Sequence, residues 1–483
     1  MSESVKHKVA SNLGWRFAER MGARLVQFGT AIVLARILGP DDYGAVALIT
    51  VFITIMQVFV DSGLGNALIQ KKNADNIDFS TVFFTNVIFC TILYVLIFFL
   101  APVVANFYGM PSLTNLTRVL GLTILISGVK NVQQAYVARK MIFKKFFFST
   151  LAGTIGAAII SIWMAYNGFG VWALVAQQVF NVTIDTLVLW ITVKWRPNFV
   201  FSFERLKGLF SYGWKLLVSG VLNAIADNLR QLVIGKMFSS VDLAYYNRGR
   251  QFPDLIVNNI NSSIDSVLLP TMSSVQDDKE RVKQMTKRSI KVSVFLMAPL
   301  MMGLAFASVN IIKVLLTDKW LPAVPYLVIF SISFLFWPIH TANLNAIKAV
   351  GRSDIFLKLE VIKQVINVIM LIVAINLGVL AIAISMIVLG VICQIINSWP
   401  NKKLIGYSYF EQLKDIIPGM LLAIVMGVAV LPFNFINLSP LICLMIQIIL
   451  GAIVYIMGAK LIKLDSYEYI MSIVKDKFAK HAK

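Results

Sequence analysis

The chain has 483 residues, of which 58% are hydrophobic and only 14% are charged. Soluble domains carry about 25% charged residues, so this composition excludes an ordinary soluble fold and predicts a protein that lies in a membrane. The net charge of +20 does not indicate a nucleic-acid ligand, because Lys and Arg stand in short clusters between long apolar runs, which is typical of membrane topology.

About fourteen apolar runs are long enough to cross a hydrocarbon core of about 30 Å as helices. Helices are required because lipid offers no partner to an unpaired backbone group, and the alternating strands of a membrane barrel are absent. The first six predicted spans are 11–38, 43–68, 80–104, 112–137, 146–166 and 168–193. The next six are 210–234, 243–269, 292–316, 320–346, 355–375 and 380–399, and the last two are 416–431 and 438–462.

The loops predict the orientation of the chain. Residues 1–11 are polar and basic and lack the apolar core of a signal peptide, so we expect the N-terminus in the cytoplasm. The predicted inner loops then carry nearly all of the loop lysines and arginines, whereas the outer loops carry only Lys236, Lys313 and Lys319. This asymmetry favours an even number of spans, with both termini in the cytoplasm.

An internal repeat predicts the domain organisation. Gly14-Trp15-Arg16 recurs as Gly213-Trp214-Lys215, and Asp42 recurs as Asp242. We therefore expect an all-α, polytopic membrane protein with two parallel six-helix lobes, 1–200 and 201–400, followed by two helices in 401–462 and a basic cytoplasmic tail in 463–483. In transporters built from parallel repeats, the substrate binds between the repeats.

Polar residues recur at helical spacing inside several spans, where ionisable groups are costly and by default face a bundle interior or a wet cavity. The first span carries Arg16, Arg20 and Arg24 on one face. Further stripes are Thr50, Thr54, Gln57 and Asp61 in the second span, Gln178, Asn181 and Asp185 in the sixth, and His340, Asn343 and Asn345 in the tenth. Together with polar residues of the seventh and eighth spans, these stripes predict a water-filled cavity between the lobes.

The arginine row indicates an anionic ligand, because planar guanidinium groups hold phosphate oxygens in pairs. Two other interpretations stay open, namely ion pairing with Glu19 or Asp61 and snorkelling of cationic side chains to lipid headgroups. The candidate substrate-binding residues are Arg16, Arg20, Arg24, Lys215, Arg230, Arg248, Arg250 and Asn258.

Four carboxylates are candidates for coupling transport to H⁺ or Na⁺, because a partly dry cavity raises the proton affinity of a carboxylate. They are Asp61, Asp227, Asp254 and Asp265, and a structural ion pair is the alternative role for each. The cysteines Cys90, Cys393 and Cys443 lie within apolar segments, so neither a disulfide framework nor a metal site is expected. No catalytic motif or cofactor motif appears, so we do not expect an enzyme.

Three segments resemble a known family. Residues 34–44 (LARILGPDDYG), 61–70 (DSGLGNALIQ) and 346–354 (AIKAVGRSD) are similar to the polysaccharide transporters, particularly the Wzx and colanic-acid exporter type, of the multidrug/oligosaccharidyl-lipid/polysaccharide exporter superfamily. The resemblance implies two six-helix lobes, alternating access and a cationic cavity.

The resemblance also implies a function. Such a flippase carries an undecaprenyl-diphosphate-linked oligosaccharide, a unit of O-antigen (lipopolysaccharide), capsule or exopolysaccharide, from the inner to the outer leaflet of the bacterial cytoplasmic membrane. The implied partners are the lipid-linked glycan, membrane lipids and the proteins of polysaccharide assembly.

Two alternatives remain from the sequence. A cation-coupled drug exporter of the same superfamily usually has twelve helices and an acidic pocket, which fits this chain less well. A membrane glycan polymerase or ligase would bind the same lipid but needs a sizeable outer loop, and the predicted outer loops here are short.

Overall fold

The computed structural model describes the backbone of residues 3–61, 64–71 and 73–481. Side chains are described within these ranges except at 3–13, 211–213, 215–216, 473–474 and 476–481. All regular secondary structure in this part of the chain is helical, which confirms the predicted all-α class.

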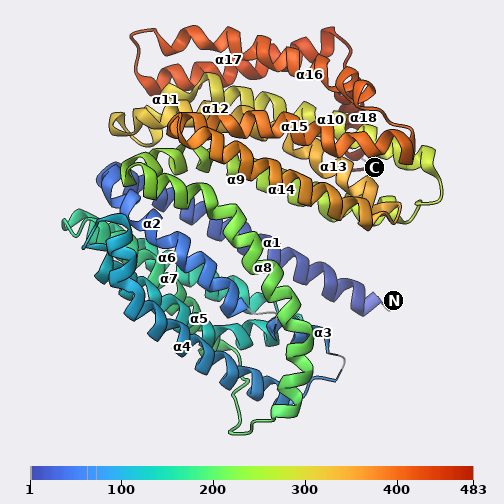
Figure 1. The fold of residues 1–483 in the computed structure, drawn as a ribbon. Coiled ribbons are helices and arrows are strands. Elements are labelled where there is room, and N and C mark those ends of the chain that lie inside the picture. Colours follow the sequence, from blue (N-terminus) through green and yellow to red (C-terminus); the bar gives the residue numbers. More distant parts are fainter. Residues whose placement is uncertain (1–2, 62–63, 72, 482–483) are drawn as a thin grey trace. The chain divides into compact units, whose positions relative to one another are not determined.

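The chain separates into two compact units, Met1–Ala244 and Tyr245–Lys483. The predicted lobe boundary at residue 200 stays a prediction. The helices of the first unit are α1 (Glu3–Ile37), α2 (Pro40–Asp61), α3 (Leu64–Gln70), α4 (Asn76–Tyr108), α5 (Leu113–Lys140), α6 (Lys144–Tyr166), α7 (Val171–Thr192) and α8 (Phe203–Met237) (Figure 1).

Helix α9 (Ser240–Ser273) begins in the first unit and continues into the second. The remaining helices of the second unit are α10 (Lys279–Phe306), α11 (Ser308–Leu315), η1 (Asp318–Ala323), α12 (Val324–Phe334), α13 (Trp337–Ala349), α14 (Ser353–Ile375), α15 (Val379–Ile405), α16 (Tyr409–Val430), η2 (Leu431–Asn434), α17 (Pro440–Leu461) and α18 (Asp465–His481).

Each predicted span coincides with one helix or with consecutive helices. The spans predicted at 292–316 and 320–346 are interrupted, as α10 and α11 and as η1, α12 and α13. The span predicted at 43–68 coincides with α2 and α3, and residues 62–63 between them lie outside the described residues. Within the described ranges, nine helical segments are long and apolar enough to cross a membrane. Helices α1, α5, α8, α9 and α14 are not among them, because charged and polar residues lower their hydropathy. The count of about fourteen spans therefore stays a prediction.

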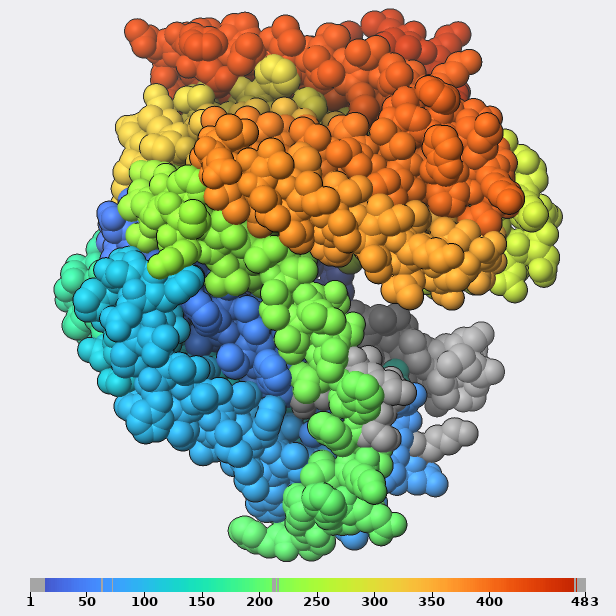
Figure 2. Space-filling model, viewed as in Figure 1, coloured from blue at the N-terminus to red at the C-terminus, as the bar shows by residue number. Residues whose placement is uncertain are grey.

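The surface of these helices is apolar, as lipid contact requires. Ile92 and Phe99 on α4, and Val361 and Ile372 on α14, are among many large hydrophobic side chains that are exposed. In Figure 2, α14 and α15 (orange) cover a broad part of one face of the second unit. In water, apolar patches of this extent would drive association. The exposed apolar surface therefore agrees with lipid as the solvent.

Helix α5 donates hydrogen bonds to both described parts of the second span, α2 and α3. The Asn131 side chain donates to the carbonyl of Val60, in the last turn of α2, at 3.4 Å. Eight residues further along α5, the Arg139 guanidinium donates to the carbonyls of Leu68 at 2.6 Å and of Lys71 at 2.5 Å. The last carbonyls of a helix have no partner within the helix, so Arg139 supplies donors at the end of α3.

The first unit is built from pairs of adjacent helices. Helix α6 packs along α7, α4 packs along α5, and α1 packs on α6 (Figure 1). At the start of α2, a Cβ atom on Gly44 would lie 2.2 Å from the backbone oxygen of Ser240, at the start of α9. The turn before Gly44 therefore approaches the turn that contains Ser240 too closely for a side chain at position 44. The predicted repeat relates these two turns.

Buried amides tie three helices of the second unit together. Asn343 on α13 and Gln412 on α16 exchange two hydrogen bonds of 2.9 and 3.0 Å. Asn401 on α15 donates to the side-chain oxygen of Asn343 at 2.7 Å. These residues, which we call the Asn343 cluster, are fully buried. Buried polar groups are normally hydrogen-bonded, so the predicted polar residue Asn343 has a structural partner set.

The predicted tail forms α18, whose first turns contact α10. Lys291 Nζ lies 2.7 Å from Asp465 Oδ2, and the Arg288 guanidinium lies 4.3 Å from the centre of the Tyr469 ring. Lys291 holds the pKa of the Asp465 carboxyl below its usual value. The start of this helix is therefore attached to the second unit by an ion pair and a cation–π contact.

Candidate functional site

A polar pocket lies within the first unit. It has a volume of about 540 Å³, which falls in the range of roughly 300–1,000 Å³ that is usual for small-molecule sites. Its lining residues come from α1, α2, α5 and α7, and we call this cavity the α2–α7 pocket. They are Gln27, Thr50, Ile53, Thr54, Gln57, Val58, Asp61, Thr123, Gln177, Gln178, Asn181 and Val182.

Two of the predicted polar stripes meet in this pocket. All four members of the α2 stripe, from Thr50 to Asp61, line it, and so do Gln178 and Asn181 of the α7 stripe. Residues three or four apart on a helix share a face, so each stripe turns one side of its helix toward the same cavity. The third member of the α7 stripe, Asp185, forms an ion pair with Lys130 at 3.2 Å instead.

Most of the amides in the pocket have no hydrogen-bond partner among the described residues. Gln57 hydrogen-bonds the Asp61 carboxylate one turn later on α2. In contrast, the side chains of Gln27, Gln178 and Asn181 make no hydrogen bond with any described residue. Each of these amides offers both a donor and an acceptor, so the pocket presents hydrogen-bonding groups that a polar ligand or water can satisfy.

Lys130 on α5 is a neighbour of the pocket that the stripe analysis missed. Its side chain is only 15% exposed. It pairs with Asp185 and also interacts electrostatically with Asp61, at the edge of the pocket. A single lysine inside an otherwise apolar run was a sufficient signal, because an ionisable residue within a span is by default functional or paired.

The arginine row on α1 divides into one paired and two unpaired side chains. The Arg16 guanidinium lies 2.6 Å from the Glu19 carboxylate and 5.0 Å from the centre of the Phe146 ring on α6. Arg20 is exposed and Arg24 is half-buried, and neither makes an ion pair with a described residue. The alternative of internal pairing with Glu19 therefore applies to Arg16, while the role of all three in substrate binding stays a prediction.

The face of α1 that carries the arginine row extends to the α2–α7 pocket. Arg20 and Gln27 are seven residues apart, which is about two turns and about 10 Å along a helix axis. Residues at this spacing lie on the same face. Because Gln27 lines the α2–α7 pocket, the face of α1 that carries Arg20 leads to the pocket.

The predicted residues of α8 are described in part. The side chain of Lys215 lies outside the described residues. Arg230 is buried and Asp227 is exposed. Their assignment to substrate binding and to ion coupling stays a prediction.

Most of the predicted residues of α9 have partners within the second unit. Arg248 is buried and lies 5.2 Å from the centre of the Trp320 ring. Arg250 forms an ion pair with Asp254 at 2.9 Å, and Asp265 accepts a hydrogen bond of 2.9 Å from the Asn345 side chain. Asn258 is exposed. The ion pair shows that Asp254 has a structural contact, and coupling through any of these carboxylates stays a prediction.

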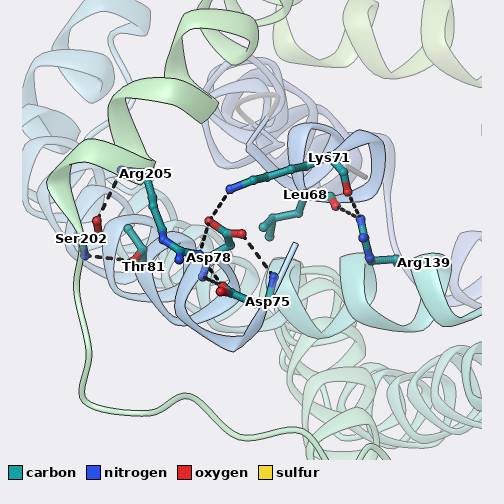
Figure 3. A network of polar contacts seen from close by, with 8 residues as sticks. All are labelled: Leu68, Lys71, Asp75, Asp78, Thr81, Arg139, Ser202 and Arg205. Atoms are coloured by element: carbon teal, nitrogen blue, oxygen red, sulfur yellow. Dashed lines mark hydrogen bonds and ion pairs between the residues drawn. The ribbon is translucent and has the colours of Figure 1, made fainter. Parts of the chain in front are cut away.

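A second polar region of the first unit contains charged rather than neutral residues. Asp78, near the start of α4, is fully buried and pairs with Lys71 at 2.7 Å and with Arg205 of α8 at 3.3 Å (Figure 3). Arg205 also lies 2.6 Å from Asp75. We call these four residues the Asp78 network. It joins the starts of α4 and α8 to the end of α3.

Asp75 also caps helix α4. Its side chain accepts the backbone N–H of Asp78 at 3.0 Å, and the Asp78 side chain accepts the backbone N–H of Asp75 at 3.2 Å. This reciprocal arrangement is a capping box. The backbone hydrogen bond from Asp78 and the Arg205 guanidinium lower the pKa of the Asp75 carboxyl.

Several known proteins similar to this chain are named for polysaccharide biosynthesis or transport. The chain is 28% identical to the succinoglycan biosynthesis transport protein ExoT of Rhizobium meliloti, over 69% of this chain and 68% of that protein. It is 24% identical to the teichuronic acid biosynthesis protein TuaB of Bacillus subtilis, over 88% and 89% of the two chains. It is 22% identical to the lipopolysaccharide biosynthesis protein WzxC of Escherichia coli, over 86% and 82%.

Solved structures of membrane transporters share the fold. The lipid II flippase MurJ, in an inward closed conformation, superposes with a TM-score of 0.71 at 16% identity, over 93% of this chain and 98% of MurJ. An inward-facing multidrug transporter of the MATE family superposes with a TM-score of 0.59 at 17% identity, over 84% and 95% of the two chains. These likenesses concern the fold alone, and they agree with a multi-pass membrane protein.

The family follows from a match over more than half of the chain. A family model described as polysaccharide biosynthesis protein matches residues 33–325. This stretch includes α2 to α7, which carry most of the pocket, and the motif at 34–44 on which the resemblance was based. The chain therefore belongs to the polysaccharide biosynthesis protein family, as the sequence motifs predicted.

Proposed function

We propose that this protein moves an undecaprenyl-diphosphate-linked oligosaccharide from the inner to the outer leaflet of the bacterial cytoplasmic membrane, with both termini in the cytoplasm. Its relatives are named for succinoglycan transport and for the biosynthesis of teichuronic acid and lipopolysaccharide. MurJ, which shares the fold, is named as a lipid II flippase. A membrane protein of this family that handles a lipid-linked glycan fits all of these names.

The observation that carries the proposal is the pair of arginines on α1. Arg20 and Arg24 make no ion pair with a described residue, and holding two charges within a membrane protein without a counter-charge is costly. A diphosphate provides that counter-charge and accepts hydrogen bonds from each guanidinium. Arg16 differs from its two neighbours because Glu19 already neutralises it.

The polyprenyl chain of the substrate needs no protein pocket. Large apolar side chains are exposed on α4 and α14, and lipid surrounds them. The isoprenoid tail stays in the bilayer while the diphosphate and the sugars enter the protein. This division assigns only the polar head of the substrate to the polar residues of the bundle.

Charge reversal at Arg24 tests the proposal. In a strain that lacks the native gene, Arg24→Glu is expected to abolish surface polysaccharide and to leave lipid-linked units on the cytoplasmic side. The reason is that the introduced carboxylate repels the diphosphate of the substrate. Arg24→Lys keeps a positive charge and is expected to restore part of the export. Lys402→Glu, at an exposed position near the end of α15, is the matched control.

The measurement is the amount of surface polysaccharide per amount of protein in the membrane fraction. Normal polysaccharide display with Arg24→Glu at normal protein levels contradicts the proposed site. An equal loss of surface polysaccharide with Lys402→Glu would indicate a general sensitivity to added negative charge. The result for Arg24 would then no longer support the proposed site.

A further inference from the structure

We infer that the α2–α7 pocket binds neutral sugar residues of the glycan, separately from the arginines that bind its diphosphate. This inference rests on the proposed function and assigns a distinct part of the same substrate to a distinct set of residues. Most of the lining residues of the pocket lie on α2 and α7, whereas the arginine row lies on α1, which contributes Gln27 to the lining.

The chemistry of the lining excludes the diphosphate as the occupant. Among the described lining residues there is no lysine or arginine, and the one charged side chain is the carboxylate of Asp61. A carboxylate repels a phosphate group at close range. An anionic headgroup is therefore better placed at Arg20 and Arg24 than inside the pocket.

The lining also argues against an apolar ligand. The lining residues that the structure describes include no aromatic side chain, and the apolar ones are Ile53, Val58 and Val182. The other lining residues are amides, threonines and Asp61. Sites for apolar molecules are lined mainly by hydrophobic and aromatic groups, whereas nine of the twelve lining residues here have polar side chains.

Sugar hydroxyl groups match what the lining offers. Each hydroxyl donates one hydrogen bond and accepts others, and each amide side chain can answer both. Gln27, Gln177, Gln178 and Asn181 make no side-chain hydrogen bond with a described residue, so their donors and acceptors are available to a ligand. Gln57 orients the Asp61 carboxylate, which can accept from a further hydroxyl.

The geometry of α1 places the two subsites in the order of the substrate. Gln27 follows Arg24 by three residues, or about 4.5 Å along the helix axis, and follows Arg20 by about 10 Å. In a lipid-linked glycan the sugars follow the diphosphate directly. A diphosphate held at Arg20 and Arg24 therefore leaves its attached sugars beside Gln27, at the wall of the pocket.

Two lipid probes distinguish binding at the sugar subsite from binding at the diphosphate subsite. The probes are undecaprenyl diphosphate without sugar and the lipid-linked oligosaccharide extracted from the source organism, each titrated against the full-length protein in lipid nanodiscs and detected by native mass spectrometry. Gln178→Met and Asn181→Leu replace amides by apolar side chains of similar size. Each is expected to weaken binding of the glycan-bearing lipid by about three- to tenfold, the effect of one or two neutral hydrogen bonds.

The bare lipid supplies the decisive comparison. Gln178→Met and Asn181→Leu are expected to leave its affinity unchanged, whereas Arg24→Gln is expected to weaken both lipids. Gln284→Met removes an exposed amide that bonds Glu280 on its own helix and is the matched control. The melting temperature of the two pocket variants is expected to equal that of the unaltered protein, because no described partner is lost.

The outcomes distinguish the two proposals. Unchanged affinity of the pocket variants for the glycan-bearing lipid overturns the sugar subsite and leaves the flippase proposal intact. An equal loss for both lipids also overturns it, since the pocket then does not distinguish sugar from diphosphate. If the unaltered protein binds neither lipid, the proposed function itself fails, and the subsite assignment fails with it.

Discussion

The Asp78 network and the α2–α7 pocket are two polar regions of the same helical unit, and they use their polar groups in opposite ways. In the network, the buried carboxylate of Asp78 has two cationic partners and a backbone donor. In the pocket, Gln178 and Asn181 have no described partner. Polar groups satisfied by protein hold helices together, whereas polar groups left open at a cavity wall are available to a ligand.

Among the changes that test this comparison, Asp78→Leu is expected to have the largest effect. Removing one partner of a buried ion pair costs about 3–5 kcal/mol. We expect a loss of about 3 kcal/mol in the free energy of unfolding, the lower end of that range, because Lys71 and Arg205 are about a third exposed and keep part of their hydration. The measurement is the unfolding of the purified protein in detergent. Lys460→Leu, at an exposed position on α17, is the control, and an equally small effect of both changes contradicts the role of the network.

Asn343→Leu tests whether satisfaction of polar groups, rather than charge, makes a region structural. The change removes the partner of two buried amides, Gln412 and Asn401. Leaving buried amides without partners is expected to cost about 2 kcal/mol, measured as a lower melting temperature. Thr341→Val, on the same helix, removes a hydroxyl that bonds only its own helix and is expected to change little. If Asn343→Leu is as stable as the unaltered protein, buried amide pairing does not set the difference between the two regions.

The smallest expected effect concerns Asp75, at the exposed rim of the Asp78 network. Its pKa is lowered in the folded protein by the Asp78 backbone N–H and by Arg205. A carboxyl with a lowered pKa stabilises the fold above its unfolded pKa of about 3.9, and this stabilisation is lost as the pH falls through the folded value. Asp75→Asn is therefore expected to lower the melting temperature slightly at pH 7 and not at all at the lowest pH that the protein tolerates.

The magnitude is small because the Asp75 side chain is about half exposed and water screens its ion pair with Arg205. Melting curves of both proteins between pH 3 and pH 8 measure the effect. A difference in melting temperature between the two proteins that grows as the pH falls would contradict the lowered pKa of Asp75.

Much of the fold was predictable from the sequence because helix formation in lipid depends on local composition. Apolar runs of sufficient length located the helices from α1 to α17, and the polar stripe from Thr50 to Asp61 indicated the face of α2 that lines the pocket. The family motif at 34–44 identified the family, because the turn before α2 has a specific sequence.

The contacts between helices were harder to predict. Arg16 and Arg24 are equivalent in the sequence pattern, yet only Arg16 has Glu19 within reach and the Phe146 ring beneath it. Lys130 pairs with Asp185, which is 55 positions further along the chain, and spacing within one helix carries no information about such a pair. The contacts of the second span also come from a neighbouring helix, because Asn131 and Arg139 of α5 donate to its carbonyls.

The donors that α5 supplies to the second span have a consequence for biosynthesis. Ribosomes make chains from the N-terminus, so α3 emerges well before Arg139 exists. Until then the final carbonyls of α3, including those of Leu68 and Lys71, have only water or headgroups as donors. The second span therefore acquires its finished shape only after the fourth has been translated, and the order of membrane insertion differs from the order of structural completion.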